Sequence, residues 1–291
     1  MHWTYGATGY RASSITTRHL PLLGGHPREL GGTLRTDAWW VGPTITVLVF
    51  SSFIAYSTWA LFQGAHYYAA PYLSPMYSPL LLVKEGVPGG APLEHAWFGA
   101  WPAWWPDFPL FPASPALLIL IFPLSFRFTC YYYRKAYYRS FAASPPGCAV
   151  SPGERPAYNG ETRFLIFQNL HRYALYFALF FILVLGWDAV QSFSKNGQLG
   201  VGVGSIVLSV NVLLIAAYTF GCHSLRHLIG GRTDCMSCGE ATVKYKAWKG
   251  ASWFNGRHML FAWLSLCWVG FTDLYVRLVS MGVIKDLNTW S

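Results

Sequence analysis

The sequence predicts an all-α integral membrane protein in which five transmembrane helices pack as a bundle. Of its 291 residues, 53% are hydrophobic and 11% are charged, whereas soluble domains carry roughly 25% charged residues. A helix that crosses the hydrocarbon core needs about 20 predominantly apolar residues, and buried helices of a soluble enzyme do not need such length. The stretches that meet this length are residues 40–62, 115–137, 165–193, 201–227 and 254–283.

The five spans are expected to form one domain, residues 39–285, which follows an N-terminal arm of residues 1–38. The connection between the first two spans, residues 65–112, is long and rich in Pro, Trp and Tyr. Aromatic rings favour the headgroup layer, so we expect this connection to cap the outer membrane surface. Gly230 and Gly231 are expected to end the fourth helix, because glycine tolerates the left-handed conformation that often follows a helix.

The basic residues gather on one side of this topology. The formal net charge is +9, and Arg and Lys are concentrated in the N-terminal arm, in the second-to-third connection and between the last two spans. By the positive-inside rule these segments face the cytoplasm, so the N-terminus is cytoplasmic and the C-terminus lies outside. The sequence carries no nucleic-acid motif to accompany this charge, and residues 1–38 are too polar and Gly-rich to be a signal peptide.

Most side chains that could hold a metal or relay electrons fall near this cytoplasmic boundary. Thiols on the reducing side of a membrane remain free for metal or redox chemistry, so the six cysteines do not predict a disulfide framework. Cys267, within the fifth span, is expected to pack. Such a cluster at one boundary indicates a redox subunit rather than a channel. The candidates are Cys130, Cys148, His171, Cys222, His223, His227, Cys235, Cys238 and His258.

A Rieske-type [2Fe–2S] cluster is the favoured interpretation of these residues, because it uses two Cys and two His and has a potential that suits quinone reduction. Cys235 and Cys238 form a C-x-x-C pair, whose tight turn can point both sulfurs at one metal. Histidines inside a membrane are expensive and usually functional. The preferred ligands are Cys235, Cys238, His227 and His258, with His223, His171 and Cys222 in reserve.

Three alternatives remain open at this point. A haem b could lie between His171 and a histidine of another span, although Cys235 and Cys238 would then be idle. The same two cysteines could act as a thiol–disulfide quinone reductase. They could also hold zinc with two imidazoles in a purely structural scaffold.

Arginines inside predicted helix ends indicate a quinone pocket. An Arg at such depth is costly unless it pairs or points to a polar site, although snorkelling to the headgroups is an alternative. A quinone carbonyl gathers negative charge on reduction and needs a donor such as Arg, Tyr or His. Asp188 and Asp273, toward the outer helix ends, could pair with polar neighbours or serve a proton path. The expected quinone-binding residues are Arg127, Tyr131, His171, Arg172, Arg226 and Trp253.

Two short motifs resemble a known family. Leu225-Arg226-His227-Leu228, followed by two glycines, is similar to the R-H-L segment that closes a helix in membrane anchors of succinate dehydrogenase and fumarate reductase. His171-Arg172 resembles the H-R step that these anchors carry beside the quinone pocket, and five helices match the single-subunit anchors. The common family pattern has a haem-ligand His seven residues before the His of R-H-L, where this chain has Phe220.

The resemblance therefore implies the haem-free actinobacterial type of anchor, in which a membrane-embedded Rieske-type cluster stands in for haem. It implies a subunit of respiratory complex II, which also serves the tricarboxylic acid cycle, in the bacterial plasma membrane. In that family a flavoprotein oxidises succinate, an iron–sulfur subunit passes electrons to the anchor, and the anchor reduces menaquinone or ubiquinone. No flavin or dicarboxylate motif is visible in the sequence, so this chain is not expected to oxidise succinate itself.

Overall fold

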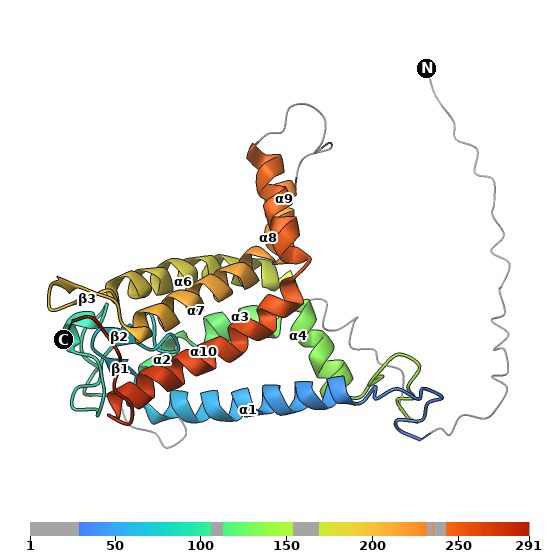
Figure 1. Ribbon diagram of the computed structural model, residues 1–291, viewed down its shortest axis with the longest axis horizontal. Helices are drawn as coiled ribbons and strands as arrows, with labels where there is room; N and C mark the ends of the chain where they lie inside the picture. Colours follow the sequence, from blue (N-terminus) through green and yellow to red (C-terminus); the bar gives the residue numbers. More distant parts are fainter. Residues whose placement is uncertain (1–28, 106–112, 154–168, 232–234, 236–242, 291) are drawn as a thin grey trace.

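The computed structural model describes residues 29–105, 113–153, 169–231, 235 and 243–290. Within these segments four helices are long and apolar enough to cross a membrane. They run side by side along the long axis of the molecule (Figure 1). The prediction of an all-α membrane protein is thus confirmed. The four helices are α1 (Val41–Gln63), α6 (His171–Gln191), α7 (Val203–Phe220) and α10 (His258–Ser280).

The second predicted span, residues 115–137, is not one continuous helix. It divides into α2 (Pro115–Ile119), α3 (Ile121–Phe128) and α4 (Tyr131–Ala136), and a π-helical turn, η2 (Tyr137–Phe141), follows. Proline has no amide hydrogen for a helix, and Pro123 lies in the first turn of α3. Cys130, between α3 and α4, has extended backbone angles (φ −68°, ψ 131°), which end the helical ladder. The prediction of an unbroken span here is therefore wrong.

The fourth predicted span, residues 201–227, is also shorter than expected. α7 ends at Phe220, and after the extended residue Cys222 (φ −64°, ψ 135°) a separate helix α8 (His223–Gly230) begins. α8 ends at Gly230, the position where the fourth helix was expected to end. The backbone of Gly231 is extended (φ −64°, ψ 154°) and not left-handed.

The start of the third predicted span, residues 165–168, lies outside the described residues, and α6 begins at His171. The fifth predicted span begins later than expected. The stretch before α10 forms a separate helix α9 (Val243–Asn255), and a break at Arg257 (φ −115°, ψ 12°) separates the two. α8 and α9 project away from one end of the bundle (Figure 1).

The long connection, of which the structure describes residues 65–105, folds against the opposite end of the bundle. It contains the antiparallel pair β1 (Tyr68–Ala69) and β2 (Tyr72–Leu73) and a 3₁₀ turn η1 (Leu93–His95). The stacked rings of Tyr67 and Tyr77, 4.3 Å apart, centre its own small core. A second hairpin, β3 (Ser194–Lys195) with β4 (Gln198–Leu199), lies at the same end (Figure 1).

A buried ion pair ties this end together. Asp273 and Arg277, one turn apart on α10, are 0% and 1% exposed, with 3.3 Å between Oδ2 and Nε. The Asp273 carboxylate also accepts hydrogen bonds from the hydroxyls of Tyr56 (2.6 Å, from α1) and Ser74 (from the connection). Arg277 donates to the carbonyl of Ala65 at 2.7 Å. The pair therefore joins α1, α10 and the connection through the hydrogen bonds of its carboxylate and guanidinium. Asp188, likewise, accepts a hydrogen bond from Ser78.

We predict that Arg277→Met destabilises the folded anchor by about 3–5 kcal/mol, because it leaves the Asp273 carboxylate buried without a counter-charge. The double variant Arg277→Met/Asp273→Asn should recover part of this loss. Thermal unfolding of the purified protein in detergent measures both. Arg35→Met removes the exposed partner of Asp37 and is the matched control, with little expected change. A single variant that unfolds at the control's temperature would contradict this role.

Candidate functional site

Two thiols and two imidazoles meet in the interior of the bundle end from which α8 and α9 project. His171 opens α6 and His258 opens α10, while Cys130 and Cys222 are the extended residues directly before α4 and α8. All four side chains are buried, with exposed fractions between 1% and 9%. The helix breaks described above therefore place each of these side chains at the same buried site.

Close contacts link the four side chains in two pairs. The Cys222 Sγ lies 3.0 Å from the His171 Nε2, and the Cys130 Sγ lies 3.6 Å from the His258 Nε2. The Oγ1 of Thr129, 2.8 Å from the His171 Nδ1, holds that ring from the other side. Both thiols are free and share one buried cluster, so they are available as thiolate ligands.

Two aromatic rings fix the orientation of the imidazoles. Phe126 stacks on His171 with ring centres 4.6 Å apart and an angle of 8° between the planes. Tyr218 stacks on His258 at 4.8 Å and 15°. Each imidazole is thus held by one aromatic face and directs one nitrogen toward a sulfur.

A metal centre fits these residues on two observations. The His258 Nδ1 is buried and has no hydrogen-bond partner among the described residues, and a buried polar atom left in this way is typical of a site that takes a water or an ion. A Cβ at Gly221 would lie 2.9 Å from that Nδ1 and 2.9 Å from the carbonyl oxygen of Phe254. Only glycine allows this close approach of backbone and imidazole.

The four donors do not crowd around one point. Within the described ranges, no three His, Cys, Asp or Glu side chains are grouped closely enough to surround one metal ion. A [2Fe–2S] cluster takes only two protein ligands on each iron, and two Cys with two His is the Rieske set. The four side chains have this composition. Their contacts pair each Cys with one His, whereas a Rieske centre holds both Cys on one iron and both His on the other.

The preferred ligands from the sequence lie in different places. His258 is in the buried group, but His227 is exposed on α8, where its Nε2 lies 2.9 Å from that of His223. Cys235 is exposed and disulfide-bonded, and Cys238 lies outside the described residues. The reserves His171 and Cys222 do join the buried group. Cys148 is exposed, and so is Cys267, which was expected to pack.

Cys130 is the ligand candidate that the proposed set omitted. A lone Cys in an apolar span counts as a small hydrophobic residue, whereas the C-x-x-C spacing is a local and conspicuous pattern. The available signal was depth: Cys130, His171, Cys222 and His258 all fall near the same boundary of their predicted spans.

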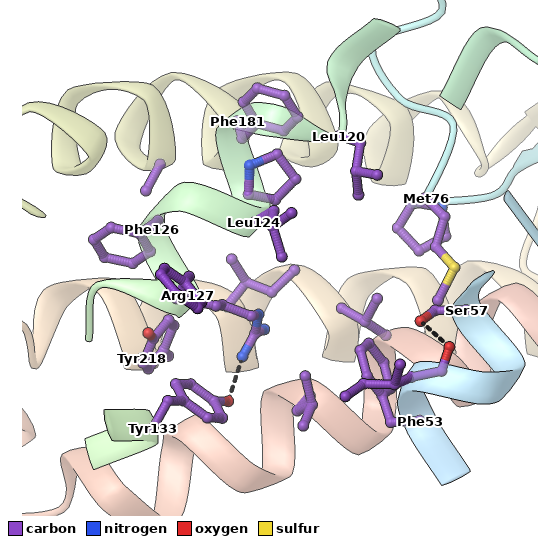
Figure 2. A pocket seen from close by; sticks show the side chains of 18 of the residues that line it. Phe53, Ser57, Met76, Leu120, Leu124, Phe126, Arg127, Tyr133, Phe181 and Tyr218 are labelled. Atoms are coloured by element: carbon purple, nitrogen blue, oxygen red, sulfur yellow. Dashed lines mark hydrogen bonds between the residues drawn. The ribbon is translucent and has the colours of Figure 1, made fainter. Parts of the chain in front are cut away.

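An apolar cavity of about 600 Å³ adjoins the buried group (Figure 2). Arg127, Tyr133 and Tyr218 line one end of it, and Ser57 and Met76 line the other. Phe126 and Tyr218 border the cavity and also stack on the two imidazoles, so one layer of rings separates the cavity from the four donors.

Arg127 is the cation at this end of the cavity. Its guanidinium donates to the Tyr133 hydroxyl at 2.7 Å and to the Ser265 hydroxyl at 3.1 Å. It also lies over the Tyr218 ring, 4.9 Å from the centroid. Neutral oxygens and an aromatic face, and no carboxylate, thus surround Arg127 in these contacts, so its positive charge can act on a bound molecule.

Of the six expected quinone-binding residues, Arg127 lines the cavity and His171 lies behind Phe126. The structure places the others elsewhere. Arg226 lies over the Trp248 ring at 4.8 Å, and the remaining three are exposed: Tyr131, Arg172 and Trp253. Tyr133, two residues after the expected Tyr131, lines the cavity and accepts a hydrogen bond from the Arg127 guanidinium.

The fold and this site together define a multi-pass helical membrane protein with a buried thiol–imidazole group beside an apolar cavity. Residues 41–282 match the family described as actinobacterial succinate dehydrogenase subunit SdhC. The chain belongs to this family and is a membrane anchor subunit of a succinate dehydrogenase. It associates with the other subunits of that enzyme in the plasma membrane.

A solved structure supports the assignment. The chain is similar to one chain of the Mycobacterium smegmatis Sdh1 complex in the apo form, with 42% sequence identity and a TM-score of 0.77. The match covers 89% of this chain and 94% of that chain. No curated protein matches the sequence.

We predict that Gly221→Ala disturbs the buried group, because the added methyl would displace the His258 ring or the backbone at Phe254. Overpacking of this kind costs about 1–3 kcal/mol. The unfolding midpoint of the purified complex should fall accordingly. Gly250→Ala on α9, where an added Cβ meets nothing within 4 Å, is the matched control. Equal midpoints for the two variants would show that the close approach at Gly221 is unimportant.

Proposed function

We propose that this anchor passes electrons from the iron–sulfur subunit to a membrane quinone through a [2Fe–2S] cluster. Its ligands are Cys130, Cys222, His171 and His258. The observation that carries the proposal is the convergence of four buried donors, two thiols and two imidazoles, from different helices. This set replaces the earlier preference for Cys235, Cys238 and His227.

When bound, a cluster with two imidazole ligands supplies one-electron transfer at a higher potential than an all-thiolate cluster. The protein's own contribution is to hold the ligands and to exclude water. Thr129 and Phe126 fix the ring of His171, and Tyr218 fixes that of His258. Residues that hold the ligands in this way commonly control both the affinity for the metal and its redox potential.

The cavity is the proposed quinone site. Its apolar walls suit an isoprenoid quinone, and its one cationic end suits the head group. The Arg127 guanidinium would stabilise the negative charge that gathers on a quinone carbonyl during reduction. The Tyr133 hydroxyl donates to the Ala262 carbonyl and accepts from Arg127. It would therefore hold a proton near the carbonyl of a quinone bound beside Arg127. Electrons would need to pass only the ring layer of Phe126 and Tyr218.

Haem b fits the same residues less well. A haem between two histidines needs open space against both rings, but aromatic faces cover His171 and His258, and neither lines the cavity. Phe220 also occupies the usual position of the haem ligand. A thiol–disulfide quinone reductase remains the second candidate, because Cys235 is disulfide-bonded.

We predict that Cys222→Ser and His171→Gln each remove the Rieske-like electron paramagnetic resonance signal and two irons from the complex. Cys267→Ser, which changes an exposed thiol on α10, is the matched control and should keep both. Cys235→Ser distinguishes the cluster from the thiol–disulfide quinone reductase. This change abolishes quinone reduction only if the disulfide carries the electrons. An active complex, prepared without oxygen and lacking iron and acid-labile sulfide in this subunit, would refute the cluster.

We predict that Arg127→Met lowers the rate of quinone reduction by about 10²-fold, the effect of removing one preorganised donor to a developing negative charge. Succinate oxidation with a water-soluble dye as acceptor should be unchanged, because that reaction bypasses the anchor. The same change at Arg172, which the structure leaves exposed, tests the sequence-based alternative. A larger loss at Arg172 than at Arg127 would place the quinone elsewhere.

A further inference from the structure

A second pair of imidazoles lies outside the buried group. His223 and His227 occupy successive turns of α8, and their Nε2 atoms are 2.9 Å apart. The two rings meet edge to face, with centroids 4.4 Å apart, and both side chains are exposed. The proposed electron path does not use either residue.

This geometry is close to that of a metal chelate. Two nitrogens bound to one tetrahedral Zn²⁺, each at about 2.0–2.1 Å, lie roughly 3.3 Å apart. The pair therefore needs to open by only a few tenths of an ångström to accept an ion. In the present contact one Nε2 carries a hydrogen and the other accepts it, and a shift of that hydrogen to Nδ1 frees both lone pairs.

The type of donor selects the class of cation. Two nitrogen donors suit Zn²⁺, Ni²⁺ or Cu²⁺, whereas Mg²⁺ and Ca²⁺ require oxygen ligands. Arg226, between the two histidines in sequence, has its guanidinium 4.8 Å from the Trp248 ring centre on α9. Because both histidines are exposed, water can complete the coordination.

We propose that His223 and His227 form an exposed binding site for a divalent cation of the zinc, nickel and copper class. This site is distinct from the buried Cys/His group and does not depend on the proposed quinone reduction. A cation there links the first and second turns of α8, which begins directly after Cys222. The site thus stabilises the helix that follows one of the four buried side chains.

Calorimetric titration of the intact detergent-solubilised complex with ZnCl₂, in buffer free of imidazole and chelators, tests the proposal. The native complex should show a saturable event with one ion per anchor that is lost in both His223→Ala and His227→Ala. His95→Ala, which removes an exposed histidine at the opposite end of the bundle, should retain it. MgCl₂ should give no event that depends on the two histidines.

Two results would overturn the proposal. One is an isotherm of His227→Ala that equals that of the native complex. The other is loss of the event in only one of the two alanine variants, which would mean that a single imidazole binds the ion. Because His223 adjoins Cys222, succinate oxidation with a dye acceptor and the unfolding midpoint verify that each variant complex is assembled. If His223→Ala does not assemble, His227→Ala alone decides, since it lies a full turn farther from the buried group.

Discussion

A helix that breaks inside a membrane must satisfy its freed backbone groups within the protein, because lipid offers no hydrogen bonds. The anchor meets this constraint at the two breaks that carry Cys130 and Cys222. At the first, the Cys130 amide donates to the carbonyl of Arg127 at 3.2 Å. At the second, the Cys222 amide donates to Thr219 at 3.0 Å, and the Asn255 side chain donates to the carbonyl of Gly221 at 2.8 Å. The satisfied breaks allow two thiols to turn inward where continuous helices would have carried them past.

The length of the apolar runs was sufficient to predict the ends of α1, α6, α7 and α10 to within seven residues, because the bilayer sets a minimum length for a spanning helix. The length of the apolar runs could not predict the helix breaks. Hydropathy scores Cys130 and Cys222 as apolar residues of a span and carries no information on their extended backbone. A local C-x-x-C pattern attracted the ligand assignment, whereas the contacts that hold the buried group join residues 42 or more positions apart in the sequence.

The two ends of the bundle contain different polar groups. At one end the Asp273–Arg277 pair joins α10 to α1 and to the long connection through buried hydrogen bonds. That attachment fixes α1 against the bundle, and α1 supplies Phe53 and Ser57 to the cavity wall (Figure 2). The cavity therefore depends on a polar network that lies outside it. At the other end, the buried polar contacts described above join thiols to imidazoles and Arg127 to neutral oxygens.

The ring layer of Phe126 and Tyr218 reconciles two opposing requirements. A site that transfers electrons to quinone must lie near its acceptor, yet its ligands must be shielded from water so that the low dielectric keeps their interactions strong. Each ring of this layer also orients an imidazole. Tyr218 adds a third role, because its face receives the Arg127 guanidinium. The charge that would attract a quinone carbonyl is thus held against the ring that covers His258, and a head group drawn to that charge would lie beside the ring layer.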